Sequence, residues 1–156
     1  MRPGTSGRSQ VLVVRAYGLT CAVPLSQVVE TMRPLSTEAI TGMPAFVRGL
    51  AIIRGTAVPV VDLGCLLGGG SGLPTTRFVL LRLGERRAAL AVEALLGVRD
   101  LEAARLHAMP PLLQQASLEL IEQVGTLDGE LLVVLRVCRT VPDDLWPALS
   151  GREAAG

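Results

Sequence analysis

The feature that most constrains the fold of this 156-residue chain is a pattern of short apolar segments that occurs twice. Residues 13–15 (VVR) match residues 80–82 (LLR) further along the chain. In the same way, residues 54–61 (RGTAVPVV) match residues 128–135 (DGELLVVL), at a slightly larger spacing. A period near 70 with one insertion, which falls in the connection 99–120, indicates two copies of one small unit.

Each copy is predicted to be a β unit, because its apolar runs are short and are bounded by turn residues. A copy has room for about five short strands and a helical turn, which is too little to bury a core alone. The copies are therefore expected to pack against each other or to share strands. Small barrels hide the edges of such units. The predicted fold class is all-β with short helices: two pseudo-repeated five-stranded β-barrels packed side by side.

The organisation along the chain follows from composition. Residues 1–9 hold Pro, Gly, Ser and Thr and are expected to be disordered, and residues 151–156 to fray. Residues 10–150 are expected to form a single domain of two interwoven barrel subdomains. The glycine-rich segment 68–76 (GGGSGLPTT) is expected to be a flexible linker between the copies. The predicted strands are 10–16, 19–25, 50–53, 57–61, 77–83 and 88–93.

Two short helices are also predicted. Ser26 is placed as the N-cap of a helical turn over residues 26–32, with Val28, Val29 and Met32 on its apolar side and Glu30 toward water. Residues 143–149 (DDLWPAL) are expected to form a short helix interrupted by Pro147, with Trp146, the only tryptophan, covering a barrel end.

The segment 46–67 (FVRGLAIIRGTAVPVVDLGCLL) is predicted to be a hairpin followed by a short helix. Gly55 supplies the backbone freedom that the reversal needs, and Gly129 takes the same place in the second copy. Asp62 is positioned to cap the helix. The guanidinium of Arg54 at the hairpin tip cannot be buried alone, so it should face solvent, a carboxylate or another protein.

Composition excludes several classes of partner. The chain is 49% hydrophobic with a net charge of +1, and it has no run of like charges that would indicate nucleic acid or an anionic membrane as a partner. No apolar run approaches the roughly 18 residues of a membrane span, and the polar N-terminus does not resemble a signal peptide. Three scattered cysteines, Cys21, Cys65 and Cys138, each within an apolar segment, favour buried thiols in a reducing compartment. A cytoplasmic protein without direct membrane insertion is expected.

The sequence offers little for catalysis. Its single histidine, His107, is placed in a loop, and no metal-binding, phosphate-binding or nucleophile motif is present. We expect neither an enzyme nor a bound cofactor or metal, and therefore a binding module. The competing hypothesis, an enzyme that uses His107 and a cysteine, is kept open for test.

The order of motifs resembles the CheW-like coupling domain of bacterial chemosensory systems. The strongest match is 44–49 (PAFVRG) followed by 54–63 (RGTAVPVVDL), and the resemblance covers roughly residues 10–142. It implies two five-stranded barrels side by side. It also implies an adaptor that links the cytoplasmic tip of chemoreceptors to the regulatory domain of the histidine kinase CheA, with receptor tips in an apolar groove between the barrels.

Carried over residue by residue, the resemblance places partner-binding positions at Val28, Glu30 and Arg54. Two positions depart from the family pattern. Ile52 stands where the family has Asn, and Arg136 stands at a typically acidic position at the end of the last strand. These departures keep a second hypothesis open: a scaffold of the same fold that has lost or changed one partner and serves a specialised, non-flagellar pathway such as pilus motility, development or polar localisation.

Overall fold

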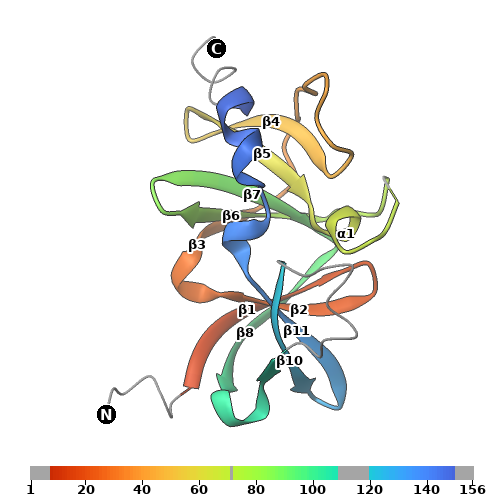
Figure 1. The fold of residues 1–156 in the computed structure, drawn as a ribbon, viewed down its shortest axis with the longest axis vertical. Helices are drawn as coiled ribbons and strands as arrows, with labels where there is room; N and C mark the ends of the chain where they lie inside the picture. The colour runs from red at the N-terminus through yellow and green to blue at the C-terminus, as the bar shows by residue number, and fades with distance from the viewer. Residues whose placement is uncertain (1–7, 71, 109–119, 150–156) are drawn as a thin grey trace.

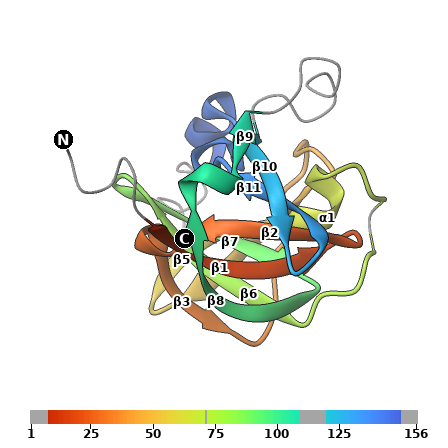
Figure 2. The same cartoon turned by 90° about the horizontal axis from the view of Figure 1, so that it is seen from below.

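The computed structural model describes residues 8–70, 72–108 and 120–149, and these residues form two curved β-sheets that lie one above the other (Figure 1). The six-stranded sheet has the order β8-β1-β2-β11-β10-β9 and the five-stranded sheet the order β3-β6-β7-β5-β4. The strands of the six-stranded sheet (Figure 2) are β1 (Arg8–Ala16), β2 (Leu19–Pro24), β8 (Ala94–Glu102), β9 (His107–Ala108), β10 (Ile121–Leu127) and β11 (Glu130–Leu135). Those of the five-stranded sheet are β3 (Val28–Met32), β4 (Val47–Ile53), β5 (Thr56–Asp62), β6 (Arg77–Leu83) and β7 (Arg86–Val92).

The predicted all-β fold of two repeated units is confirmed, with two differences. One sheet has six strands, because β9 adds to its edge. Within the described residues, no backbone ladder joins the outer strands of either sheet, so each is an open, curved sheet where a closed barrel was expected.

The two copies exchange strands. The repeat seen in the sequence maps β1, β2 and β3 onto β6, β7 and β8, and it maps β4 and β5 onto β10 and β11. Each sheet therefore combines the first hairpin of one copy with the later strands of the other. The registers repeat as well: Val14 lies opposite Leu95, and at the equivalent positions of the other sheet Leu81 lies opposite Val28. Of the two arrangements left open by the sequence, sharing of strands is the one that occurs.

This exchange explains why the strands are apolar on both faces. Val11 and Val13 of β1 point into a core inside the six-stranded sheet, whereas Leu12 and Val14 point into a central core between the sheets. In β6, Leu80 lies in the core of the five-stranded sheet and its neighbours face the central core. A strand buried on both sides needs a continuous apolar run, as the sequence has.

Two predicted elements before residue 33 differ from the structure. The segment 26–32 is not a helix: only Leu25–Gln27 forms a 3₁₀ turn, without a side-chain cap, and Val28–Met32 is strand β3. Pairing with β6 overrides the predicted helix, and the β-branched residues of VVETM suit a strand. β1 begins at Arg8, inside the segment expected to be disordered, because β8 extends to Glu102 and pairs with it.

The segment 68–76 is anchored at both ends, although it was expected to be a flexible linker. The backbone N–H of Gly69 donates to the carbonyl of Gly64 over 2.9 Å. At the other end, the hydroxyl of Thr76 donates to the carbonyl of Glu93 over 2.6 Å. The predictions for residues 1–7 and 151–156 lie outside the described residues, as does most of the expected insertion (109–119).

Helical structure is confined to short pieces. α1 (Leu63–Leu66) follows β5, and 3₁₀ turns span Ala103–Arg105, Val137–Arg139 and Asp143–Leu145. Residues 146–149 form a last helical turn that Pro147 does not interrupt, because proline is tolerated in a first turn. Trp146 is 6% exposed and packs against the central core. In the part of the chain that the structure describes, no helix has the length and apolar character to cross a membrane.

Candidate functional site

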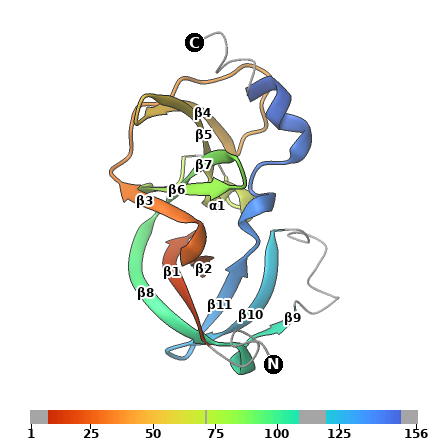
Figure 3. The same ribbon diagram turned by 90° about the vertical axis from the view of Figure 1, so that its left-hand side faces the viewer.

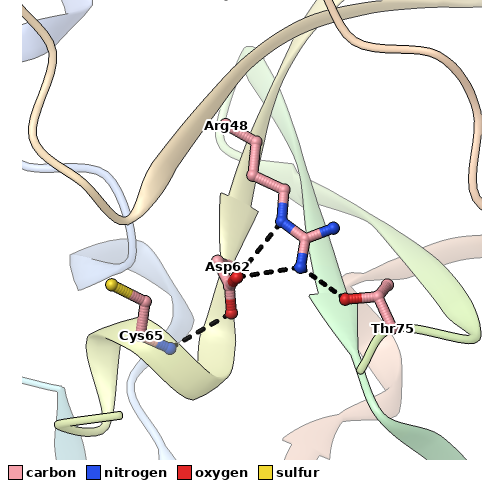
Figure 4. Close-up of polar contacts among 4 residues, drawn as sticks. All are labelled: Arg48, Asp62, Cys65 and Thr75. Carbon is pink, nitrogen blue, oxygen red and sulfur yellow. Dashed lines mark hydrogen bonds and ion pairs between the residues drawn. The ribbon is translucent and has the colours of Figure 1, made fainter. Parts of the chain in front are cut away.

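The least exposed ion pair in the described residues joins Arg48 to Asp62 at the base of the β4–β5 hairpin (Figure 4). Arg48 donates from Nε over 3.1 Å and from Nη2 over 2.8 Å to Oδ2 of Asp62, and Nη2 also donates to the hydroxyl of Thr75. The other oxygen, Oδ1, accepts from the backbone N–H of Cys65 over 3.1 Å, so Asp62 is the N-cap of α1. The Asp62 side chain is 6% exposed and that of Arg48 is 26% exposed.

Both oxygens of this carboxylate are engaged, which satisfies a buried charge and suits a structural role. The cluster ties β4, β5, α1 and the segment before β6 together. Sequence reasoning found the cap but missed Arg48. The signal was present: counting outward from the turn at Arg54–Gly55 brings Arg48 beside the end of β5.

A second ion pair, between Glu30 and Arg54, lies at the surface of the five-stranded sheet. Arg54 and Gly55 have φ of 53° and 79°, the conformation of a tight type I′ hairpin turn. Arg54 donates from Nε to Oε2 of Glu30 over 2.9 Å and from Nη2 to Oε1 over 2.8 Å. β3 and β4 are the outer strands of this sheet, so a bidentate side-chain contact joins the β4–β5 tip to β3 where no backbone ladder does.

The hydrogen bonds from Arg54 lower the pKa of Glu30, with further lowering by the positive charges of Arg54 and Arg87. The same contact raises the pKa of Arg54. The pair is therefore fully charged at neutral pH. Arg54 remains 73% exposed, which leaves guanidinium surface free for contact with another molecule.

We predict that the Glu30 carboxyl titrates below the ordinary glutamate range and that Arg54→Ala moves its pKa back upward. A depressed folded-state pKa contributes stability that is present above the unfolded pKa and is lost as pH falls through the folded value. Carbon-detected NMR titration of the Glu30 side chain measures its pKa in the wild type and in Arg54→Ala. Arg99→Ala, which removes an ion pair at the other end of the molecule, should leave the Glu30 titration unchanged, and an unchanged titration in Arg54→Ala would refute the assignment.

Val28, which the resemblance places among the partner-binding positions, is half-buried and packs against the central core. The exposed apolar residue of this strand is the neighbouring Val29, which occupies an irregularity in the β3–β6 register. This irregularity puts Val28 and Glu30 on opposite faces of β3: Val28 pairs with Leu81 and faces the central core, whereas Glu30 pairs with Leu80 on the face of the other core. The structure therefore brings Glu30 and Arg54 together, whereas Val28 lies on the other face of β3.

The second copy has a similar ion pair at its hairpin turn, with the charges reversed. Asp128 and Gly129, with φ of 52° and 82°, occupy the turn between β10 and β11. Asp128 accepts from Nη1 of Arg99 over 2.8 Å and from Nη2 over 3.2 Å. These bonds lower the pKa of Asp128. The tip residue is thus cationic in the five-stranded sheet and anionic in the six-stranded sheet.

The thiols of Cys21 and Cys65 are not activated as nucleophiles. Burial raises the pKa of the Cys21 thiol to about 12, and burial, with the charge of Asp62, raises the pKa of Cys65. Both remain thiols at neutral pH, which opposes nucleophilic chemistry. Cys65 is only half-buried, unlike the full burial expected for it, and the side chain of Cys138 lies outside the described part of the structure. His107 lies exposed on the short edge strand β9 rather than in a loop.

Comparison with known proteins identifies a family for this chain. A model of the family described as "CheW-like domain" matches residues 10–144. The fold is similar to the crystal structure of the scaffolding protein TtCheW from Thermoanaerobacter tengcongensis, with a TM-score of 0.75, 20% sequence identity, and coverage of 83% of this chain and 89% of that one. Because the family model spans most of the sequence, the chain belongs to the CheW-like domain family, a family of scaffold and adaptor proteins of chemotaxis signalling.

Proposed function

We propose that this protein is a non-catalytic adaptor of the cytoplasm that couples the tips of chemoreceptors to the regulatory domain of a CheA-type histidine kinase. The observation that carries the proposal is the exposed ion pair of Glu30 and Arg54. It sits on a tight hairpin turn and an edge strand, so its guanidinium is held in place before a partner arrives. Pre-organised arginines at an exposed edge are common anchors of protein interfaces.

The surroundings of Arg54 support a protein partner. Ile52 lies on β4 two residues before Arg54, and it is 66% exposed. An arginine and an apolar residue near the tip of one hairpin match the composition of interface centres. We infer that the kinase regulatory domain contacts this end of the five-stranded sheet.

A separate apolar surface supports the receptor contact. Val29 on β3 and Leu96 on β8 are exposed and lie at equivalent positions of the two copies, and Val98 is exposed further along β8. Figure 3 shows β3 and β8 on the same side of the molecule, where one strand of each sheet is at the edge. An apolar receptor hairpin fits a surface of this kind.

Charge-swap variants test the kinase contact. Arg54→Glu should weaken binding to the cognate regulatory domain by about tenfold or more, as measured by calorimetry. The variant removes a cationic donor and places a second carboxylate beside Glu30, which repels it. The double variant Glu30→Arg/Arg54→Glu restores an internal ion pair with reversed polarity and should fold normally yet remain defective. Arg8→Glu, an equal change of charge in the other sheet, is the matched control and should bind as the wild type does.

Binding to neither a cognate kinase nor a receptor fragment would reject the adaptor proposal. Equal binding by Arg54→Glu and Arg8→Glu would place the kinase contact elsewhere. Turnover of any substrate that is lost in His107→Ala would favour the enzyme hypothesis instead.

The second candidate, a scaffold of a specialised non-flagellar pathway, is favoured by Ile52. Where the family pattern has an amide, this chain exposes an apolar side chain close to Arg54, which favours a different partner surface. Arg136 gives weaker support for this candidate, because Glu122 lies 3.8 Å from its guanidinium and offsets part of its charge. Exchanging Ile52→Asn and comparing affinity for kinases of flagellar and non-flagellar gene clusters separates the two candidates.

A further inference from the structure

The tip of the β6–β7 hairpin concentrates positive charge. Arg82 on β6 and Arg86 and Arg87 on β7 are all exposed, and the antiparallel register sets Arg82 directly opposite Arg87. Like charges directly opposite each other destabilise a strand pair. Among the described residues, no carboxylate oxygen lies within ion-pair distance of these three guanidinium groups.

Nearby acidic residues do not balance this charge. Glu30 feels the charge of Arg87 but gives both of its oxygens to Arg54. Glu85, in the turn of the same hairpin, is the other carboxylate that lines this region. The local group carries a net charge of +2, from four arginines against two glutamates: Arg54, Arg82, Arg86, Arg87, Glu30 and Glu85.

A pocket opens beside these arginines. It has a volume of about 230 Å³ and is lined by residues 56–58, residues 85–87 and Trp146. The guanidinium carbon of Arg86 lies 4.8 Å from the centroid of the Trp146 ring. A guanidinium stacked on a ring is held in orientation, and its in-plane N–H groups stay available as donors.

The fold itself does not require this cluster. At the equivalent place in the first copy, the β1–β2 hairpin has Arg15 where β6 has Arg82, and Thr20 where β7 has Arg87. Arg15 has a carboxylate partner, since Glu130 lies 3.6 Å away. The first copy thus forms the same hairpin without facing arginines. The repulsion between Arg82 and Arg87 in the second copy therefore needs another explanation.

We propose that the tip of the β6–β7 hairpin is a docking site for an acidic segment of a partner protein, whose carboxylates bind the facing pair of Arg82 and Arg87 and, around the tip on the other face of the hairpin, Arg86 stacked on Trp146. Carboxylates accept paired hydrogen bonds from guanidinium groups and would remove the repulsion between the facing arginines. Nucleic acid fits less well, because the chain has a net charge of only +1 and Trp146 is too buried to stack with a base. The site goes beyond the adaptor role, since it assumes neither a kinase nor a receptor.

The only tryptophan of the chain provides the measurement, because it contacts Arg86. Titration with a fluorescein-labelled peptide of about ten alternating Glu and Ser residues should give saturable anisotropy, and the unlabelled peptide should change the fluorescence of Trp146. Arg82→Gln/Arg87→Gln should weaken binding by about tenfold or more while leaving the stacked pair in place. Arg8→Gln/Arg105→Gln removes the same two charges at exposed positions near the six-stranded sheet, so it is the matched control and should bind as the wild type does.

Absence of binding, or equal binding of a peptide with Gln in place of Glu, would overturn the proposal. An equal loss in Arg8→Gln/Arg105→Gln would show that only net charge matters and would overturn it too. Tighter binding of oligo-dT than of the Glu peptide would assign the patch to nucleic acid. These outcomes use no kinase domain, so they are independent of the test of the adaptor role.

Discussion

Asp62→Ala is expected to lower the free energy of unfolding by about 3 kcal/mol, because it leaves the half-buried guanidinium of Arg48 without its partner. Breaking a fully buried pair costs somewhat more, but Arg48 keeps access to water through the exposed part of its side chain. Loss of the cap on α1 contributes about 1 kcal/mol of the total. Urea denaturation followed by circular dichroism measures the change.

Two variants separate the causes in this prediction. Asp62→Asn keeps an oxygen for the backbone N–H of Cys65 and removes the charge, so its effect should be intermediate. Glu122→Ala breaks an exposed ion pair and should cost less than about 1 kcal/mol. If Asp62→Ala were no more harmful than Glu122→Ala, the cluster in Figure 4 would not be a structural junction.

Gly49→Ala is expected to cost about 4 kcal/mol, because this position demands both an unusual backbone conformation and an empty space. Its φ is 136°, and a Cβ would overlap the carbonyl oxygen of Glu38. Avoiding that overlap separates Glu38 from Leu50, which exchange two backbone hydrogen bonds of 2.8 and 2.9 Å. Backbone strain accounts for about 1–3 kcal/mol and the lost hydrogen bonds for about 1 kcal/mol each.

Gly129→Ala is the matched control for Gly49→Ala. Its φ of 82° is also left-handed, but nothing lies within 4 Å of an added Cβ. Only the backbone penalty remains, about 1 kcal/mol. Thermal and urea unfolding should therefore show a clearly larger loss of stability for Gly49→Ala than for Gly129→Ala. Similar losses of stability would mean that the segment around Glu38 does not pack on β4 as described.

Much of the hairpin chemistry could be predicted from sequence because its causes are local. Gly55 and Gly129 mark the two turns, and both reversals occur there. Asp62 precedes a short apolar segment and caps it, since a cap depends on residues close together in the chain. The helix predicted over residues 26–32 was wrong because a distant strand, β6, supplies hydrogen bonds that local propensity cannot anticipate.

The contacts that depend on exact strand register or on distant segments were not predicted in the same way. Glu30 and Arg54 were named separately on the basis of family resemblance, and only the curvature of the five-stranded sheet brings them into contact. The facing pair of Arg82 and Arg87 needs the β6–β7 register, which the sequence reasoning did not extend to individual side chains. Arg48 was missed for the same reason.

The order of residues was enough to establish that one β unit occurs twice, where most of its strands and turns fall, and which family the chain resembles. The exchange of strands between the copies, through the parallel pairs β2 with β11 and β5 with β7, is visible only in the folded molecule. The physical reason is that both copies have nearly the same apolar pattern, so either could supply a complementary strand to either hairpin. The choice depends on which arrangement buries both faces of every central strand, a property of the assembled cores rather than of any segment.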